Sequence, residues 1–173
     1  MIVLSCIFSA IMFVWFTPPT TNDKKLATVS YLNDFGENST SDQSKVTLLR
    51  KGHDMVDVSY QSRPFYNLKG LRFGGTGITN SHGTYLFGAM LGKTMEFNKI
   101  GLTVASSINY SNISSYDASR LSFFINYKST FDITYAIKNN IHAGIGLMHI
   151  SNASVKKPNS GINAVRGTIY FFM

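Results

Sequence analysis

The sequence predicts an all-β protein, an eight-stranded antiparallel transmembrane β-barrel, and three observations lead to this fold class. Only 14% of the 173 residues are charged, while 44% are hydrophobic and 13% aromatic, and a soluble domain has roughly 25% charged residues. Beyond residue 16, no apolar run approaches the roughly 20 residues of a membrane helix. Polar turns instead separate β-prone segments of about ten residues, the length of a membrane strand.

The segment 1–22 is expected to be a secretory signal peptide, followed by one barrel domain over 23–173. Its apolar run, residues 2–16, has the length of a signal-peptide hydrophobic region. No basic residue precedes the run and no Ala-x-Ala site follows it, so an uncleaved anchor or a buried N-terminal helix is the alternative. The single cysteine, Cys6, lies in this run, and a processed chain would contain none.

Eight strands are expected along the chain, with no helical period over any long window. Turn signals such as Asn80-Ser81-His82-Gly83, Asn98-Lys99 and Asn139-Asn140 separate them. The expected strands cover 26–33, 46–61, 68–76, 84–93, 97–110, 119–138, 141–152 and 162–173, with loops at 34–44 and 109–117. A soluble lipocalin-like barrel or a β-sandwich has similar strand spacing and is the alternative fold.

The expected seventh strand carries the residues with the most chemical content. His149 and Ser151 are two positions apart, so in a strand both side chains leave the same face. The imidazole could then take the proton of the serine hydroxyl. Ile145 and Leu147 share this parity, which predicts a His–Ser pair on an apolar stripe of the outer wall, open to a lipid ester. The neighbouring glycines have the opposite parity and are expected to point inward.

The run His149-Ile150-Ser151-Asn152-Ala153-Ser154, followed by Asn159 and Gly161, resembles the signature of the PagL family of outer-membrane lipid A 3-O-deacylases, or acyloxyacyl hydrolases. The resemblance continues upstream through Val58-Ser59-Tyr60-Gln61-Ser62-Arg63-Pro64 and covers about residues 52–173. It implies a barrel in the outer membrane of a Gram-negative cell. It also implies a serine esterase that hydrolyses the 3-hydroxyacyl ester at position 3 of lipid A in lipopolysaccharide.

The resemblance implies a role for each matching residue. Ser151 is the expected nucleophile and His149 the general base, while Asn152 and Asn159 are candidates to donate hydrogen bonds to the oxyanion. Tyr127 lies where the family usually has a phenylalanine, and packing or substrate contact is its expected role. This chemistry requires no cofactor.

Asn163 departs from the family pattern, which places a glutamate at this position to orient the histidine. An amide oxygen can accept the same hydrogen bond, as in papain-like Cys-His-Asn sites, but it supplies no negative charge. The chain has two glutamates, Glu37 and Glu96, and neither lies in the part of the signature around Asn159 and Gly161. Asp34 is a conceivable substitute. We therefore expect a slower esterase. The alternative is a catalytically silent barrel with a structural or adhesive role.

The formal net charge of +7 predicts attraction to an anionic partner. Basic side chains at a barrel rim would attract the phosphates of lipid A. The candidates are Lys156, Lys157, Arg166, Arg63, Lys69 and Arg72. Nucleic acid is not expected as a partner, because no helix-turn-helix, zinc spacing or basic-aromatic ribbon is present. His53, His82 and His142 are scattered without nearby carboxylate spacing, so no metal is expected. A homodimer is left open.

Overall fold

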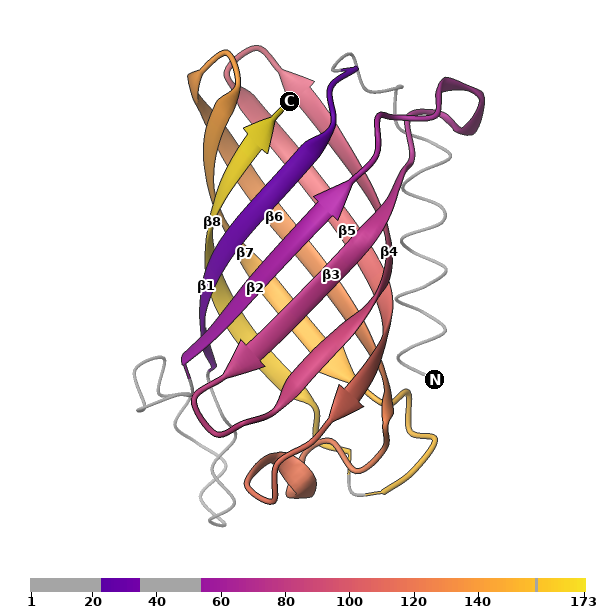
Figure 1. The fold of residues 1–173 in the computed structure, drawn as a ribbon. Helices are drawn as coiled ribbons and strands as arrows, with labels where there is room; N and C mark the ends of the chain where they lie inside the picture. The colour runs from indigo at the N-terminus through magenta and orange to yellow at the C-terminus, as the bar shows by residue number, and fades with distance from the viewer. Residues whose placement is uncertain (1–22, 35–53, 158) are drawn as a thin grey trace, which may run out of the picture.

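Eight antiparallel strands close into a barrel in the computed structural model of the chain (Figure 1). The structure describes residues 23–34, 54–157 and 159–173, so the expected signal peptide lies outside the described residues. Sequence neighbours pair throughout, and β1 closes the barrel against β8. The strands are β1 Leu26–Asp34, β2 Asp54–Gln61, β3 Arg72–Asn80, β4 Tyr85–Phe97, β5 Ile100–Asn112, β6 Ile125–Lys138, β7 Ile141–Ser151 and β8 Ile162–Phe172. The predicted fold class is confirmed.

Several strand boundaries differ from the prediction. A 3₁₀ helix covers Tyr66–Leu68, and Lys69 and Gly70 follow with φ of 54° and 81°. Because a strand needs negative φ, β3 begins only after them. A second 3₁₀ helix, Asp117–Ser119, lies within the expected sixth strand, and β6 begins only at Ile125. In contrast, β5 continues to Asn112, through residues that the sequence analysis placed in a loop.

The barrel has two unlike ends, which fix the position of the site (Figure 1). We call the lower end in the figure the long-loop end; it holds the connections 81–84, 113–124 and 152–161. The opposite, terminal end holds the connections 62–71, 98–99 and 139–140, together with the start of β1 and the end of β8. Strands β1, β3, β5 and β7 therefore all run toward the long-loop end.

Side chains alternate between the barrel interior and the outer wall, most regularly along β1 and β8. Toward the long-loop end, the interior is closed by an apolar cluster of side chains from the strands and the 113–124 connection. Its buried members are Leu32, Met55, Ile78, Leu86, Leu121, Met148, Ile150, Ile162 and Ala164. The interior faces of β7 and β8 behind the candidate site are thus packed by this cluster.

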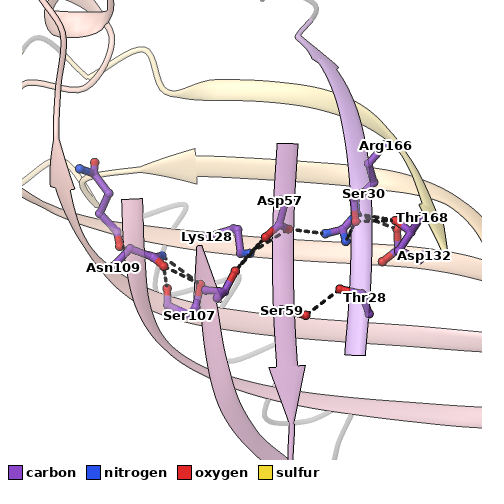
Figure 2. Close-up of polar contacts among 12 residues, drawn as sticks. Thr28, Ser30, Asp57, Ser59, Ser107, Asn109, Lys128, Asp132, Arg166 and Thr168 are labelled. Carbon is purple, nitrogen blue, oxygen red and sulfur yellow. Dashed lines mark hydrogen bonds and ion pairs between the residues drawn. The ribbon is translucent and has the colours of Figure 1, made fainter. Parts of the chain in front are cut away.

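The middle of the interior is polar and its charges are paired (Figure 2). Lys128 of β6 donates to both carboxylate oxygens of Asp57 at 3.0 Å, and Thr76 of β3 donates to the same carboxylate at 2.8 Å. Arg166 of β8 lies 3.3 Å from Asp57 and 3.2 Å from Asp132. Two acids and two bases therefore connect β2, β6 and β8 across a lumen filled by side chains, as expected for eight strands.

The outer wall is apolar, with exposed aromatic side chains toward each end. Those toward the long-loop end are Tyr31, Tyr85, Phe87, Tyr110, Tyr116 and Phe124, and those toward the terminal end are Tyr60, Phe65, Tyr66, Phe73, Phe97, Tyr135 and Phe171, while Phe131 lies midway along β6. Exposed aliphatic residues such as Val58, Ile133 and Ile145 lie between them. This arrangement is typical of a transmembrane barrel and excludes the soluble alternatives. Among the described residues, no helix has the length and apolar character needed to cross a membrane.

Candidate active site

The face predicted for the His–Ser pair on β7 is confirmed. Ile145 and Leu147 are 65% and 55% exposed on the outer wall, and His149 and Ser151 follow with the same parity toward the long-loop end. The glycines point inward, since a Cβ added to Gly146 would collide with an interior carboxylate. Ser151 is the last residue of β7 and is buried, whereas His149 is half-buried. The pair thus lies where the lipid-facing wall meets the loops.

Asn163 lies directly across from His149 in the pairing of β7 with β8. The Nδ1 atom of His149 is 2.8 Å from Oδ1 of Asn163. Because an amide oxygen can only accept, this contact requires a proton on Nδ1 and leaves Nε2 of the neutral ring as an acceptor. The amide end that faces the imidazole is therefore the one that supports a general base.

Tyr127 is the partner of Ser151 on the other side of β7, in the register of β6. It is half-buried and faces outward, so its ring borders the wall beside the serine. No hydrogen bond between Ser151 and His149 is recorded within the described ranges. Their proximity follows from the shared strand face, and in free enzymes such contacts often tighten only when substrate binds.

Gly161, just before β8, lies against both His149 and Ser151. A Cβ added there would lie 2.7 Å from the Ile150 carbonyl oxygen, 3.1 Å from Cε1 of His149 and 3.6 Å from Cβ of Ser151. Its φ of 74° also favours glycine. Only a residue without a side chain lets the backbone approach both His149 and Ser151 this closely.

Asn152 and Asn159 fold the 152–161 connection onto the end of β7. The Asn152 backbone N–H donates to Oδ1 of Asn159 at 3.0 Å. The Asn152 side chain donates through Nδ2 to the Lys156 carbonyl at 2.7 Å and to Ser122 Oγ at 3.3 Å. Oδ1 of Asn152 is buried without a recorded partner. Both predicted oxyanion donors are thus beside Ser151, but the donors of Asn152 already have loop acceptors.

Asp34, considered as a substitute for the missing glutamate, has another partner. Its carboxylate is buried and accepts two hydrogen bonds from the guanidinium of Arg120, one of them 3.1 Å long from Nη2. Burial lowers the pKa of the Arg120 guanidinium. The hydrogen bond to Asp34 and the negative charge of Asp34 outweigh burial, so the pKa of Arg120 is raised above its ordinary value. The sequence analysis missed Arg120, because no local pattern connects it to either strand.

The six cations predicted at the barrel rim occupy three different environments. Lys156 and Lys157 are exposed on the loop next to the site. Arg166 is wrong as a rim residue, because it points inward and pairs with Asp57 and Asp132. The other three candidates, Arg63, Lys69 and Arg72, lie where β2 connects to β3 at the terminal end, away from the site, and Arg72 is fully buried. No cluster of three potential metal-ligating side chains occurs among the described residues.

The closed barrel with an apolar, aromatic-banded outer wall defines a transmembrane β-barrel protein. The sequence pattern of the family described as lipid A 3-O-deacylase (PagL) matches residues 54–170, and the chain belongs to this family. Family and fold together identify a β-barrel protein of the Gram-negative outer membrane. No curated protein matches the chain.

Three solved structures show the same fold at low sequence identity. A de novo designed transmembrane β-barrel has a TM-score of 0.57 and 10% identity, covering 90% of this chain and 99% of the other. The outer membrane enzyme PagL has a TM-score of 0.56 and 11% identity, with 84% and 98% covered. Neisserial surface protein A has a TM-score of 0.50 and 13% identity, with 86% and 96% covered.

Proposed function

We propose that this protein is a serine esterase that removes the acyl chain from position 3 of lipid A, with Ser151 as nucleophile and His149 as general base. The observation that carries the proposal is the 2.8 Å contact between His149 Nδ1 and Asn163 Oδ1 on the lipid-facing wall. It orients the ring with Nε2 available as an acceptor, next to a serine of the same strand face. Membership of a lipid A 3-O-deacylase family supplies the substrate class.

In the proposed reaction, Ser151 Oγ attacks the ester carbonyl carbon while His149 Nε2 takes the hydroxyl proton. The imidazolium donates its Nδ1–H to Asn163 Oδ1. Collapse of the tetrahedral intermediate breaks the bond to the sugar oxygen, which receives the proton from Nε2. Water then hydrolyses the acyl-enzyme in the same two steps and releases a 3-hydroxy fatty acid. No cofactor enters this sequence.

The oxyanion needs donors beside Ser151. One candidate donor is Nδ2 of Asn159, whose Oδ1 accepts the Asn152 backbone N–H. The second is that Asn152 N–H itself, which would donate to the oxyanion in place of Asn159 Oδ1. Tyr127, opposite Ser151, is proposed to contact the acyl chain. Membrane barrels place their longer loops outside the cell, so the long-loop end would lie in the leaflet that contains lipid A.

A catalytically silent barrel with a structural or adhesive role is the second candidate. Asn163 favours it, because an amide cannot stabilise the imidazolium with a full charge. The structural neighbours that share the fold include a designed barrel and a surface protein, so the fold alone implies no chemistry.

The test is the mass of lipid A from a Gram-negative host that expresses the full chain. We expect loss of one 3-hydroxyacyl chain with the unchanged protein, and a decrease in rate of at least about 10³-fold with Ser151→Ala or His149→Ala. Ser115→Ala, an exposed serine in the 113–124 connection, is the matched control and should retain the rate. Heat-dependent gel mobility reports whether each barrel is folded.

An unchanged lipid A mass with folded, unsubstituted protein would support the silent barrel instead. Activity that survives Ser151→Ala would exclude the serine mechanism, and activity lost with Ser115→Ala would show that the assay reports folding.

A further inference from the structure

Arg120 connects three separate parts of the long-loop end. Its Nε donates to the Gly161 carbonyl at 3.2 Å, and its own carbonyl accepts the Gly161 N–H at 3.3 Å. The two terminal nitrogens of the same guanidinium bind the carboxylate of Asp34 at the end of β1. One side chain therefore ties β1 to the residue that lies against His149 and Ser151.

The backbone of Arg120 is held independently of these contacts. It caps the 3₁₀ helix Asp117–Ser119 through an N–H bond to Asp117 O, and the next residue, Leu121, is fully buried in the apolar cluster. The buried Asp117 carboxylate accepts hydrogen bonds from Asn80 at 2.8 Å and Thr84 at 2.6 Å. The base of the Arg120 side chain is thus anchored to the barrel, so the guanidinium is a fixed support rather than a mobile surface cation.

We infer that Arg120, braced by Asp34, is a positioning residue for the His149–Ser151 pair and acts through Gly161. We call these three residues, Asp34, Arg120 and Gly161, the Arg120 clamp. The inference rests on the proposed function for its catalytic consequence. Arg120 has no recorded contact with His149 or Ser151 and takes no part in proton transfer.

The clamp matters because pairing between β7 and β8 does not hold Gly161 in place. Ile162 is the last β8 residue paired with β7, opposite Ile150, so Gly161 and Ser151 both lie beyond the recorded β7–β8 pairing. The two Arg120–Gly161 hydrogen bonds replace a ladder contact there. Loss of the guanidinium removes the Nε bond to the Gly161 carbonyl and the tie to Asp34, and leaves only the backbone bond from the Gly161 N–H. Gly161 can then move away from the imidazole ring, and a displacement of about 1 Å at a reacting pair costs about 100-fold in rate.

The experiment compares Arg120→Ala with Arg63→Ala in the full chain, purified in detergent and assayed on lipid A. Arg63 is exposed at the opposite, terminal end. We expect Arg120→Ala to lower kcat by about 10- to 100-fold with KM changed less than about twofold, and Arg63→Ala to change neither. A residue needed only for folding would reduce the folded fraction on heat-dependent gels and leave kcat of the folded fraction unchanged, which would overturn the inference.

A second readout is independent of catalysis. With ¹⁵N-labelled histidine, the ring signals of His149, assigned with His149→Gln, should shift in Arg120→Ala and stay in place in Arg63→Ala. If the unsubstituted protein releases no acyl chain but these signals shift, the proposed function fails and the clamp stands. If the protein is active and Arg120→Ala leaves both kcat and the signals unchanged, the clamp fails alone.

Arg120→Lys is the variant to use where Arg120→Ala does not fold. Lysine keeps the charge opposite Asp34 but has no planar fork that reaches both Asp34 and the Gly161 carbonyl. The kcat of Arg120→Lys should therefore be lower than that of the unsubstituted protein, as for Arg120→Ala. In addition, Asp34→Asn and Arg120→Lys should be non-additive, because both act on one contact; additive losses would show that Asp34 does not act through Arg120.

Discussion

At the residue scale, Asn163 is the side chain that orients His149 in the proposed site. Its Oδ1 faces His149 Nδ1 at 2.8 Å, so it holds the ring tautomer without a charge. Asn163→Glu should therefore raise kcat on lipid A, by about 10-fold or more, because a carboxylate stabilises the imidazolium that forms in the transition state. Asn163→Ala should lower kcat, because the ring then loses its orienting acceptor. Steady-state rates of purified protein measure both effects.

Asn139→Glu is the control for the added charge, because Asn139 is an exposed turn residue at the terminal end. It should leave kcat unchanged. Equal rates for unsubstituted protein, Asn163→Glu and Asn163→Ala would show that Asn163 has no catalytic role. The sequence predicted Asn163 as the third member from its place in the family signature, but not the direction of its amide, which depends on the register of β7 against β8.

At the element scale, the first half of the β7–β8 connection, residues 152–157, is held by hydrogen bonds and carries two exposed cations. Its backbone is held by Asn152 Nδ2 on the Lys156 carbonyl, which places Lys156 and Lys157 next to the site. Replacing both lysines with glutamine should raise KM for lipid A by about three- to tenfold at low salt, since an exposed ion pair contributes about 0.2–1 kcal/mol. We expect kcat to stay the same, because neither lysine contacts the reacting groups.

The matched control replaces Lys99 and Lys138 with glutamine, since both are exposed at the terminal end. The same change in KM from both pairs would indicate a general charge effect on membrane or micelle rather than recognition at the site. High salt should abolish the difference between unsubstituted protein and the Lys156/Lys157 variant; a difference that persists in high salt contradicts electrostatic attraction.

The elements differ in how far the sequence predicts them. The period of two placed His149 and Ser151 on the outer face of β7, because alternation is a local property of a strand. The same parity, applied to β8 from Asn163, would have placed Arg166 inside. In contrast, Arg120 is separated from Gly161 by 41 positions and from Asp34 by 86. Contacts of that range depend on barrel closure and loop packing, which no periodic pattern encodes.

At the scale of the whole molecule, the buried charges in the lumen hold the barrel wall behind the site. Asp57 binds Lys128, Thr76 and Arg166, and the side chains of Asp57 and Lys128 are each 1% exposed. Asp57→Ala should destabilise the folded barrel by about 3–5 kcal/mol, because it leaves a buried cation without its partner. Urea denaturation in detergent, followed by the heat-dependent gel shift, measures this loss.

Asp54→Ala on the same strand is the control for this last prediction. Asp54 is exposed and accepts hydrogen bonds from Tyr31 and Asn33 on the outer wall, so its removal should cost less than about 1 kcal/mol. Asp57 and His149 lie on different faces and strands, so Asp57→Ala at a temperature where the barrel stays folded should keep most of the esterase rate. Loss of rate without loss of folded protein would mean that the lumen charges also set the geometry of the outer wall. Equal stability losses for Asp54→Ala and Asp57→Ala would show that the interior network contributes no more than a surface contact.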